Sequence, residues 1–133
     1  MDSFIAPIPK IHFDAGQSLL NEKDWIALGT DAWELMKEFE VGANVLIYVS
    51  HDQADPVFTH RAEFFGLIDN PVDMKKAEVE GYRPNTAVGE PWVCYWRIGK
   101  VEKLVEPIPF GSVQLKSGRY LTSYPRGPMA TKS

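Results

Sequence analysis

The sequence predicts an α+β fold, in the form of a small mixed β-barrel with short flanking helices. Helical patterns occur only before residue 41, and three strong strand patterns follow them. Helices and strands also do not alternate regularly, as they would around a parallel sheet. The 133 residues fit a single domain over 1–133, because domains cluster near ~100–150 residues.

The first element expected is an extended N-terminal arm over residues 1–10, because this segment contains Pro7 and Pro9. At most a short strand is predicted at Lys10–Phe13. A helical turn over Glu22–Leu28 should follow, with Asn21 as its cap and Gly29 at its end.

A second helix is predicted to begin at Thr30 or Asp31. With Asp31 as the cap, Glu34 occupies the third helical position, as in a capping box. Trp33 falls at the edge of the apolar stripe of this helix, so it is a candidate for a ring outside the core. The stripe has helical spacing and consists of Ala32, Leu35, Met36 and Phe39.

Three strands are predicted from runs of β-branched and aromatic residues, at Val45–Ser50, Val57–Ile68 and Trp92–Leu104. Gly66 inside the second run indicates a bulge or the close approach of another backbone. A weaker strand is expected at Tyr120–Ser123. Between the second and third strands, residues 72–91 form a loop of a length that is often functional, and residues 128–133 are expected to form a flexible tail.

Composition excludes several classes of protein. Cys94 is the only cysteine, so an internal disulfide or a cysteine-based zinc cluster is excluded, and the three histidines lack metal-ligand spacing. The sequence contains no phosphate-binding glycine motif and no nucleophile elbow. We therefore expect no metal and no cofactor. No apolar run reaches the length of a membrane span, and a reducing, cytoplasmic location is the simplest expectation.

The net charge of −4 argues against generic electrostatic binding to nucleic acid, but the charge is unevenly distributed. Residues 1–59 carry three basic and ten acidic side chains, whereas residues 60–133 carry eleven basic and eight acidic ones. From Pro107 onward there is no acidic side chain. This basic segment is either a solvated surface or a patch that faces phosphates.

Three segments in order resemble the core of PUA-like domains: VGANVLIYVS, RAEFFGLIDNPVD and WVCYWRIGKVEKLVEPIPF. The segment NEKDWIALGTDAW resembles the opening of the EVE branch of that superfamily, and GRYLTSYPRGPM resembles its late aromatic strand and glycine turn. The similarity covers roughly residues 20–129. Each motif is loose, and their order is the specific part.

The resemblance implies a non-catalytic domain whose aromatic pocket accepts a flipped, often methylated, base of DNA or RNA. Aromatic stacking of ~1–3 kcal/mol per base can offset the few kcal/mol needed to unstack that base. The side chains that the resemblance and strand alternation assign to the pocket are Trp33, Tyr48, Ser50, Tyr82 and Trp92. Arg119 and Arg126 are expected to meet phosphates.

Each of these residues also has a purely structural interpretation. Trp33 and Tyr48 could be core residues, and the sole role of Tyr82 could be to anchor its loop. At least one of Trp92 and Trp96 should lie in the barrel core, since they share a strand face. Arg97 could pair with Glu63 on a neighbouring strand instead of touching a ligand, and Arg119 and Arg126 could simply be solvated.

Two other classes of function stay open. The related ASCH domains include small amidohydrolases that act on modified nucleosides through a lysine, a threonine and a glutamate, for which Thr59, Glu63 and Lys100 are available. Alternatively, the acidic N-terminal half could bind a protein partner or a second copy of the chain, which would make the domain an interaction module or a homodimer.

Overall fold

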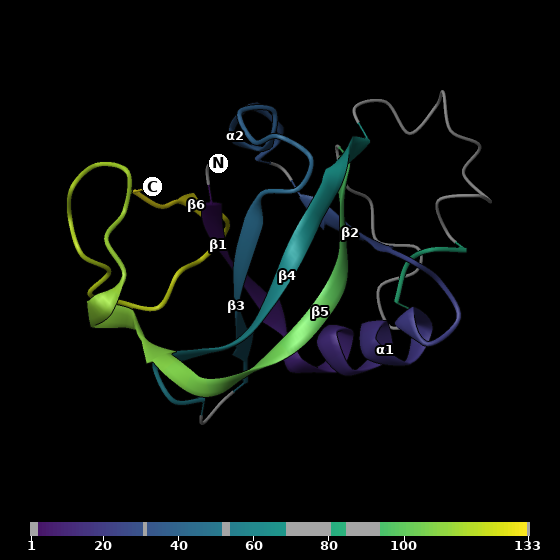
Figure 1. The fold of residues 1–133 in the computed structure, drawn as a ribbon, viewed down its shortest axis with the longest axis horizontal. Coiled ribbons are helices and arrows are strands. Elements are labelled where there is room, and N and C mark those ends of the chain that lie inside the picture. The colour runs from purple at the N-terminus through teal and green to yellow at the C-terminus, as the bar shows by residue number, and fades with distance from the viewer. Residues whose placement is uncertain (1–2, 31, 52–53, 69–80, 85–93, 133) are drawn as a thin grey trace.

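A mixed sheet of six strands curls into a half-barrel in the computed structural model, with two short helices beside it (Figure 1). The structure describes residues 3–30, 32–51, 54–68, 81–84 and 94–132, except for the side chains of Trp33 and Cys94. This arrangement confirms an α+β fold with a barrel-like sheet.

The strand order across the sheet is β2-β5-β4-β3-β1-β6. Strands β1 and β3 are parallel, and the other neighbours are antiparallel. The strands are β1 (Ser3–Pro9), β2 (Ile26–Thr30), β3 (Asn44–Ser50), β4 (Val57–Ile68), β5 (Cys94–Pro109) and β6 (Met129–Ala130). The helices are α1 (Lys10–Leu20) and α2 (Trp33–Met36), and the 3₁₀ turn η1 covers Phe110–Ser112.

The predicted strands at Val45–Ser50 and Val57–Ile68 are confirmed as β3 and β4, and the third pattern is confirmed as β5. In β4 the residues Ala62, Phe64 and Ile68 are buried, in the alternation expected for a half-buried strand. Gly66 has a φ of 115° at a register shift between β4 and β5, which confirms the predicted bulge.

The main hydrophobic core, called the inner cluster below, lies inside the curled sheet. Its residues come from five strands and from both helical regions. Phe4 lies at its centre, with ring centroids 4.3 Å from Phe39, 5.5 Å from Phe64 and 5.7 Å from Trp96. The cluster consists of Phe4, Ala6, Ile8, Phe13, Ile26, Leu28, Met36, Phe39, Ala43, Val45, Ile47, Ala62, Phe64, Trp96 and Ile98.

The outer cluster lies where the C-terminal segment packs against the opposite face of β1 and β3. Ile5 and Tyr48 belong to it, and they alternate along their strands with members of the inner cluster. Its buried members are Ile5, Tyr48, Phe58, Phe110, Val113, Leu115 and Leu121. The segment that follows β5 therefore folds back as a second layer.

The N-terminal segment departs from the prediction. Residues 1–10 were expected to be an arm, but Ser3–Pro9 is a strand between β3 and β6, with Phe4, Ile5 and Ala6 fully buried. Proline has no N–H to donate to a neighbouring strand. Pro7 and Pro9 are tolerated because β6 pairs only with Phe4 and Ile5, so the edge of β1 that faces β6 is unpaired with it at both prolines. The short strand expected at Lys10–Phe13 is wrong, since α1 begins at Lys10.

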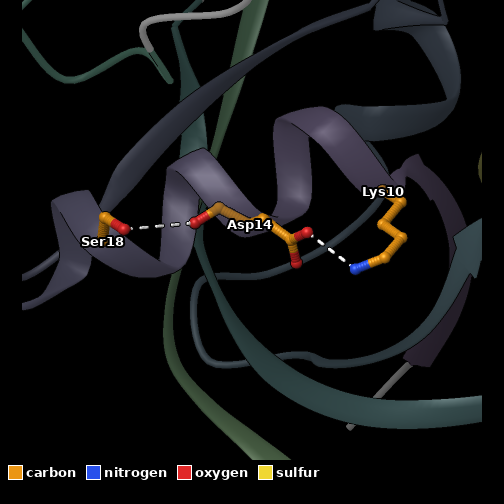
Figure 2. A network of polar contacts seen from close by, with 3 residues as sticks. All are labelled: Lys10, Asp14 and Ser18. Carbon is orange, nitrogen blue, oxygen red and sulfur yellow. Dashed lines mark hydrogen bonds and ion pairs between the residues drawn. The ribbon is translucent and has the colours of Figure 1, made fainter.

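The polar face of α1 points away from the sheet. Lys10 Nζ lies 2.7 Å from Asp14 Oδ2, and Ser18 Oγ donates to the carbonyl of Asp14 at 3.4 Å (Figure 2). Both charged side chains are more than half exposed, so this pair contributes little to stability. On the other side of the helix, Phe13 and Gly16 are buried.

The helical turn predicted over Glu22–Leu28 is also wrong, because Ile26–Thr30 is strand β2. Ile26, Ala27 and Leu28 are all buried, which a strand covered on both faces allows, and they pair with β5. Pairing and burial thus override the local capping signals of the sequence. The second predicted helix is reduced to the single turn α2, although Met36 and Phe39 are buried as its stripe predicted.

The C-terminal predictions need two corrections. Instead of a strand at Tyr120–Ser123, the structure has one isolated bridge between Gln114 and Tyr120. Instead of a free tail after residue 127, Met129–Ala130 pairs with β1, and the Thr131 N–H donates to the Ser3 carbonyl at 3.0 Å. The backbone of Lys132 donates to Gln114 at 2.9 Å, so the tail is held within the second layer.

Candidate functional site

A cavity of about 610 Å³ lies between the two edges of the curled sheet. One wall is β2 with the start of the α2 region, and the opposite wall combines the end of β1 with the segment that precedes β6. Its volume falls within the ~300–1,000 Å³ that is typical of small-molecule sites. The described lining residues are Pro7, Ile8, Pro9, His12, Leu28, Gly29, Thr30, Ala32, Ser50, Arg83, Trp96, Pro125, Arg126, Gly127 and Pro128.

The parallel pairing of β1 with β3 positions the part of the cavity formed by their carboxyl ends. The register places Pro9 beside Ser50 and Ile8 beside Val49. Because α1 begins directly after Pro9, its first turn brings His12 into the same wall. The end of β3 therefore meets the end of β1 and the first turn of α1 at one end of the half-barrel.

The aromatic residue in the described lining, besides the His12 ring, is Trp96 of β5. Trp96 is paired in register with Leu28, and its ring meets Phe4 edge-on, with an interplanar angle of 63°. Only 3% of this residue is exposed, so the inner cluster holds the indole in place. Trp96 thus contributes an apolar part of the lining.

Hydroxyl groups add polarity to the walls. Thr30 Oγ1, at the end of β2, accepts a hydrogen bond from the Ala32 N–H at 3.0 Å. Ser50 lies at the end of β3 and is half-buried. A ligand with hydrogen-bonding edges would meet these groups at the walls, while its faces meet apolar side chains.

The ionisable side chains in the described lining are all basic: His12, Arg83 and Arg126. Arg83 is buried, its Cζ lies 4.8 Å from the ring centroid of Tyr95, and its Nη1 donates to the Tyr95 hydroxyl at 3.4 Å. Arg126 is exposed at the edge of the cavity. Within the described ranges, the ion pairs are Lys10–Asp14, Arg61–Glu102 and Lys100–Glu63, so Arg126 takes part in none.

Of the residues that the sequence assigned to a base pocket, Ser50 lines this cavity, and of the two arginines expected to meet phosphates, Arg126 does. Arg119 is exposed in a tight turn, in which its backbone carbonyl accepts a hydrogen bond from the Leu115 N–H. It is not part of the described lining of the cavity. The side chain of Trp33 and the whole of Trp92 lie outside the described residues. For these two, the predicted contact with a base stays a prediction.

Tyr48 and Tyr82 are not among the described lining residues, and both pack against other aromatic side chains. Tyr48 packs in the outer cluster, with ring centroids 5.1 Å from Phe110 and 5.6 Å from Tyr124. Burial, with a smaller contribution from Tyr124, raises the pKa of Tyr48 above its ordinary value. The Tyr82 ring stacks on Trp25 at 3.8 Å on the outside of β2 and β5.

The residues suggested for amidohydrolase chemistry do not meet at the cavity. Lys100 Nζ lies 3.3 Å from Glu63 Oε2 in an exposed ion pair between β4 and β5. Thr59 Oγ1 instead lies 2.8 Å from His60 Nδ1. The suggested pairing of Arg97 with Glu63 is also wrong, because Arg97 Nε donates to the Gly66 carbonyl at 3.4 Å.

Sequence reasoning missed most of the lining: Pro7–Pro9, His12, Leu28–Thr30, Arg83, Trp96 and the prolines and glycine around Arg126. One signal was present, since closely spaced prolines in a strand mark a sheet edge. The others carry no local signal, because the curl of the sheet brings them together.

No protein-family model matches the chain, and a search of curated proteins finds no similar one. Among the described residues, no helix is long and apolar enough to cross a membrane. Within the same residues, no three His, Cys, Asp or Glu side chains are grouped so that they could hold a metal ion.

Proposed function

We propose that the cavity between the sheet edges binds a heterocyclic base, in a modified and methylated form, that is displaced from a strand of DNA or RNA. In this proposal the domain is a reader without catalytic function, and its half-barrel is a variant of the PUA-like, EVE-type fold suggested by the order of its strand motifs. The cavity of about 610 Å³, whose lining is mostly apolar and carries a few polar groups, supports the proposal.

The lining supports a planar, partly apolar ligand. Leu28, Ile8 and Trp96 supply apolar contact, and the Thr30 and Ser50 hydroxyls lie in the walls, where a base edge has its donors and acceptors. A methyl group buried against such walls gains about 0.8 kcal/mol, which corresponds to roughly a fourfold increase in affinity. A larger preference would require that the N–H which the methyl group replaces is buried without a partner when the unmodified base is bound.

Arg126 supports a ligand that remains attached to its strand. Its side chain is exposed at the edge of the cavity and makes no ion pair within the described part of the chain, which supports a contact with phosphate in this proposal. Arg119 offers a matched control. It is an exposed arginine of the same basic segment, but it lies in the turn between Leu115 and Tyr120.

The test is a fluorescence titration with single-stranded oligonucleotides that differ in one base, either unmodified or carrying N6-methyladenine or 5-methylcytosine. We expect at least one methylated oligonucleotide to bind about fourfold or more tightly than its unmodified counterpart. Equal binding of both, with a steep dependence on salt alone, would leave only electrostatic association and remove the modified-base proposal.

Variants of Arg126 and of the control residue Arg119 distinguish a phosphate contact from a base contact. Arg126→Ala should weaken the binding of methylated and unmodified strands to the same extent and reduce the magnitude of the slope of log K against log salt by about 0.7, the value for one phosphate contact on a single strand. Arg119→Ala should change neither the slope nor the preference for the methyl group. If the two variants behave alike, Arg126 has no special place at the site.

A further inference from the structure

Arg83 enters the cavity wall from a short segment, residues 81–84, that runs along the outer edge of β2. The Tyr82 carbonyl accepts a hydrogen bond from the Ala27 N–H at 2.8 Å, while the opposite edge of β2 pairs with β5. Pro84 is fully buried against α1, where a Cβ added at Gly16 would lie 3.6 Å from Pro84 Cγ. The segment is thus fitted between a strand edge and a helix.

A stack of four side chains on the outside of the sheet holds this segment. The rings of Trp25 and Tyr82 are 3.8 Å apart and inclined by only 9°. The Arg97 guanidinium lies 5.2 Å from the centroid of Trp25, and Lys23 Nζ lies 4.9 Å from the centroid of Tyr82. The two rings stack on each other, and each also makes a cation–π interaction with a basic side chain, so all three contacts in the stack are favourable.

The stack is anchored in the bulge of β4. Arg97 Nε donates to the carbonyl of Gly66, at 3.4 Å. A Cβ added at Gly66 would lie 2.8 Å from Arg97 Nη2, so the glycine leaves room for the guanidinium. The φ of 115° at Gly66 is also one that residues with a Cβ rarely adopt. A continuous set of contacts therefore connects the bulge with residue 82.

We propose that Trp25 is a positioning residue of the cavity: its stack with Tyr82 fixes residues 81–84 against β2 and thereby sets Arg83 in the wall. Arg83 follows Tyr82 directly, and its guanidinium passes over the Tyr95 ring to the Tyr95 hydroxyl. Trp25 is not among the described lining residues, so it acts on the cavity only through the segment that it holds. The effect on a ligand rests on the proposed function, whereas the effect on the segment does not.

The first experiment uses no ligand and measures amide hydrogen exchange by NMR, corrected for intrinsic rates, in Trp25→Ala and Trp25→Phe. The Ala27 amide reports on the 81–84 segment, and the Phe64 amide, which donates to the Ala43 carbonyl at 2.9 Å, reports on the half-barrel. In Trp25→Ala we expect exchange at Ala27 to rise about tenfold or more, with less than about a twofold change at Phe64. Trp25→Phe, which keeps a flat ring, should restore most of the protection.

Equal acceleration at both amides would show a general loss of stability, and no change at Ala27 would show that the stack holds nothing; either result overturns the proposal. If Trp25→Ala does not fold, Arg97→Met carries the same test, because it removes the guanidinium from Trp25 and leaves both rings. In that variant we expect a smaller, but still selective, acceleration at Ala27.

The second experiment asks whether the position of Arg83 matters for binding, with the methylated single-stranded oligonucleotide as the probe. Trp25→Ala and Arg83→Met should each weaken binding about tenfold, and the double variant should be no weaker than Arg83→Met alone. Independent, multiplicative losses would contradict a positioning role. If the unaltered protein binds no oligonucleotide, the proposed function fails, while the exchange experiment still decides whether the stack holds residues 81–84.

Discussion

The inner and outer clusters are both rich in aromatic residues, but the cavity of about 610 Å³ is bordered by members of the inner cluster and by no buried member of the outer one. In the outer cluster, the centroid of the Phe110 ring lies 4.9 Å from that of Phe58, 5.1 Å from that of Tyr48 and 5.5 Å from that of Tyr124. These rings therefore pack directly against one another. In the inner cluster the sheet curls without closing, and its two edges leave a gap beside Trp96. An abundance of rings therefore does not identify a binding pocket, because the backbone must also hold walls apart.

The largest expected difference between the two clusters is in stability. Phe64→Ala should lower the free energy of unfolding by about 3–5 kcal/mol, because Phe64 is enclosed by Phe4 and Phe39 and only 1% exposed. Phe110→Ala should cost less, since the half-exposed Tyr124 beside it can shift into the space. Urea denaturation of both variants measures this difference, and an equal or larger loss at Phe110 would contradict it.

Two glycines sharpen the same contrast at the backbone. In the half-barrel, a Cβ at Gly99 would overlap the backbone carbonyl oxygen of Asp24 and would lie 2.8 Å from the Phe65 ring. Gly99→Ala should therefore lower the free energy of unfolding by about 1–3 kcal/mol, the usual cost of overpacking. Gly111, in the C-terminal layer, has nothing within 4 Å of an added Cβ, so Gly111→Ala should be close to neutral. Thermal unfolding of both proteins compares them, and similar losses would argue against a tight approach at Gly99.

Two nearby residues of β3 distinguish the clusters by binding. Ser50 lines the cavity, so Ser50→Ala should weaken binding of the methylated oligonucleotide by roughly 2- to 12-fold, the equivalent of one hydrogen bond. Tyr48 belongs to the outer cluster, so Tyr48→Phe should leave the affinity unchanged. A titration of the two variants under identical salt conditions decides between them. If Tyr48→Phe weakens binding and Ser50→Ala does not, the ligand is not in this cavity.

The smallest expected effect concerns the pH dependence of stability and arises at His60 on β4, whose ring packs 4.6 Å from Phe13. Burial, with a smaller contribution from Lys103, lowers the pKa of His60 in the folded protein. The unfolded chain therefore takes up the proton first, near its ordinary pKa of about 6.5, and stability falls as the pH drops below that value. Urea titrations at a series of pH values should show a weaker fall in His60→Gln than in the unaltered protein; an unchanged curve would assign the effect to other groups.

The sequence by itself determined the three long strands, the bulge at Gly66 and the burial of Met36 and Phe39, because periodic burial and chain geometry are local properties. It did not determine β1 or β2, since Pro7 and Pro9 and the cap-like Asn21 are overridden when residues 3–9 and 26–30 find partners on β3 and β5. It placed Ser50 and Arg126 at a site, but it could not place Leu28, Arg83 and Trp96 beside them. Those residues meet only because a twisted sheet curls until its edges face each other, and that curl depends on strand order, which no short segment of the chain encodes.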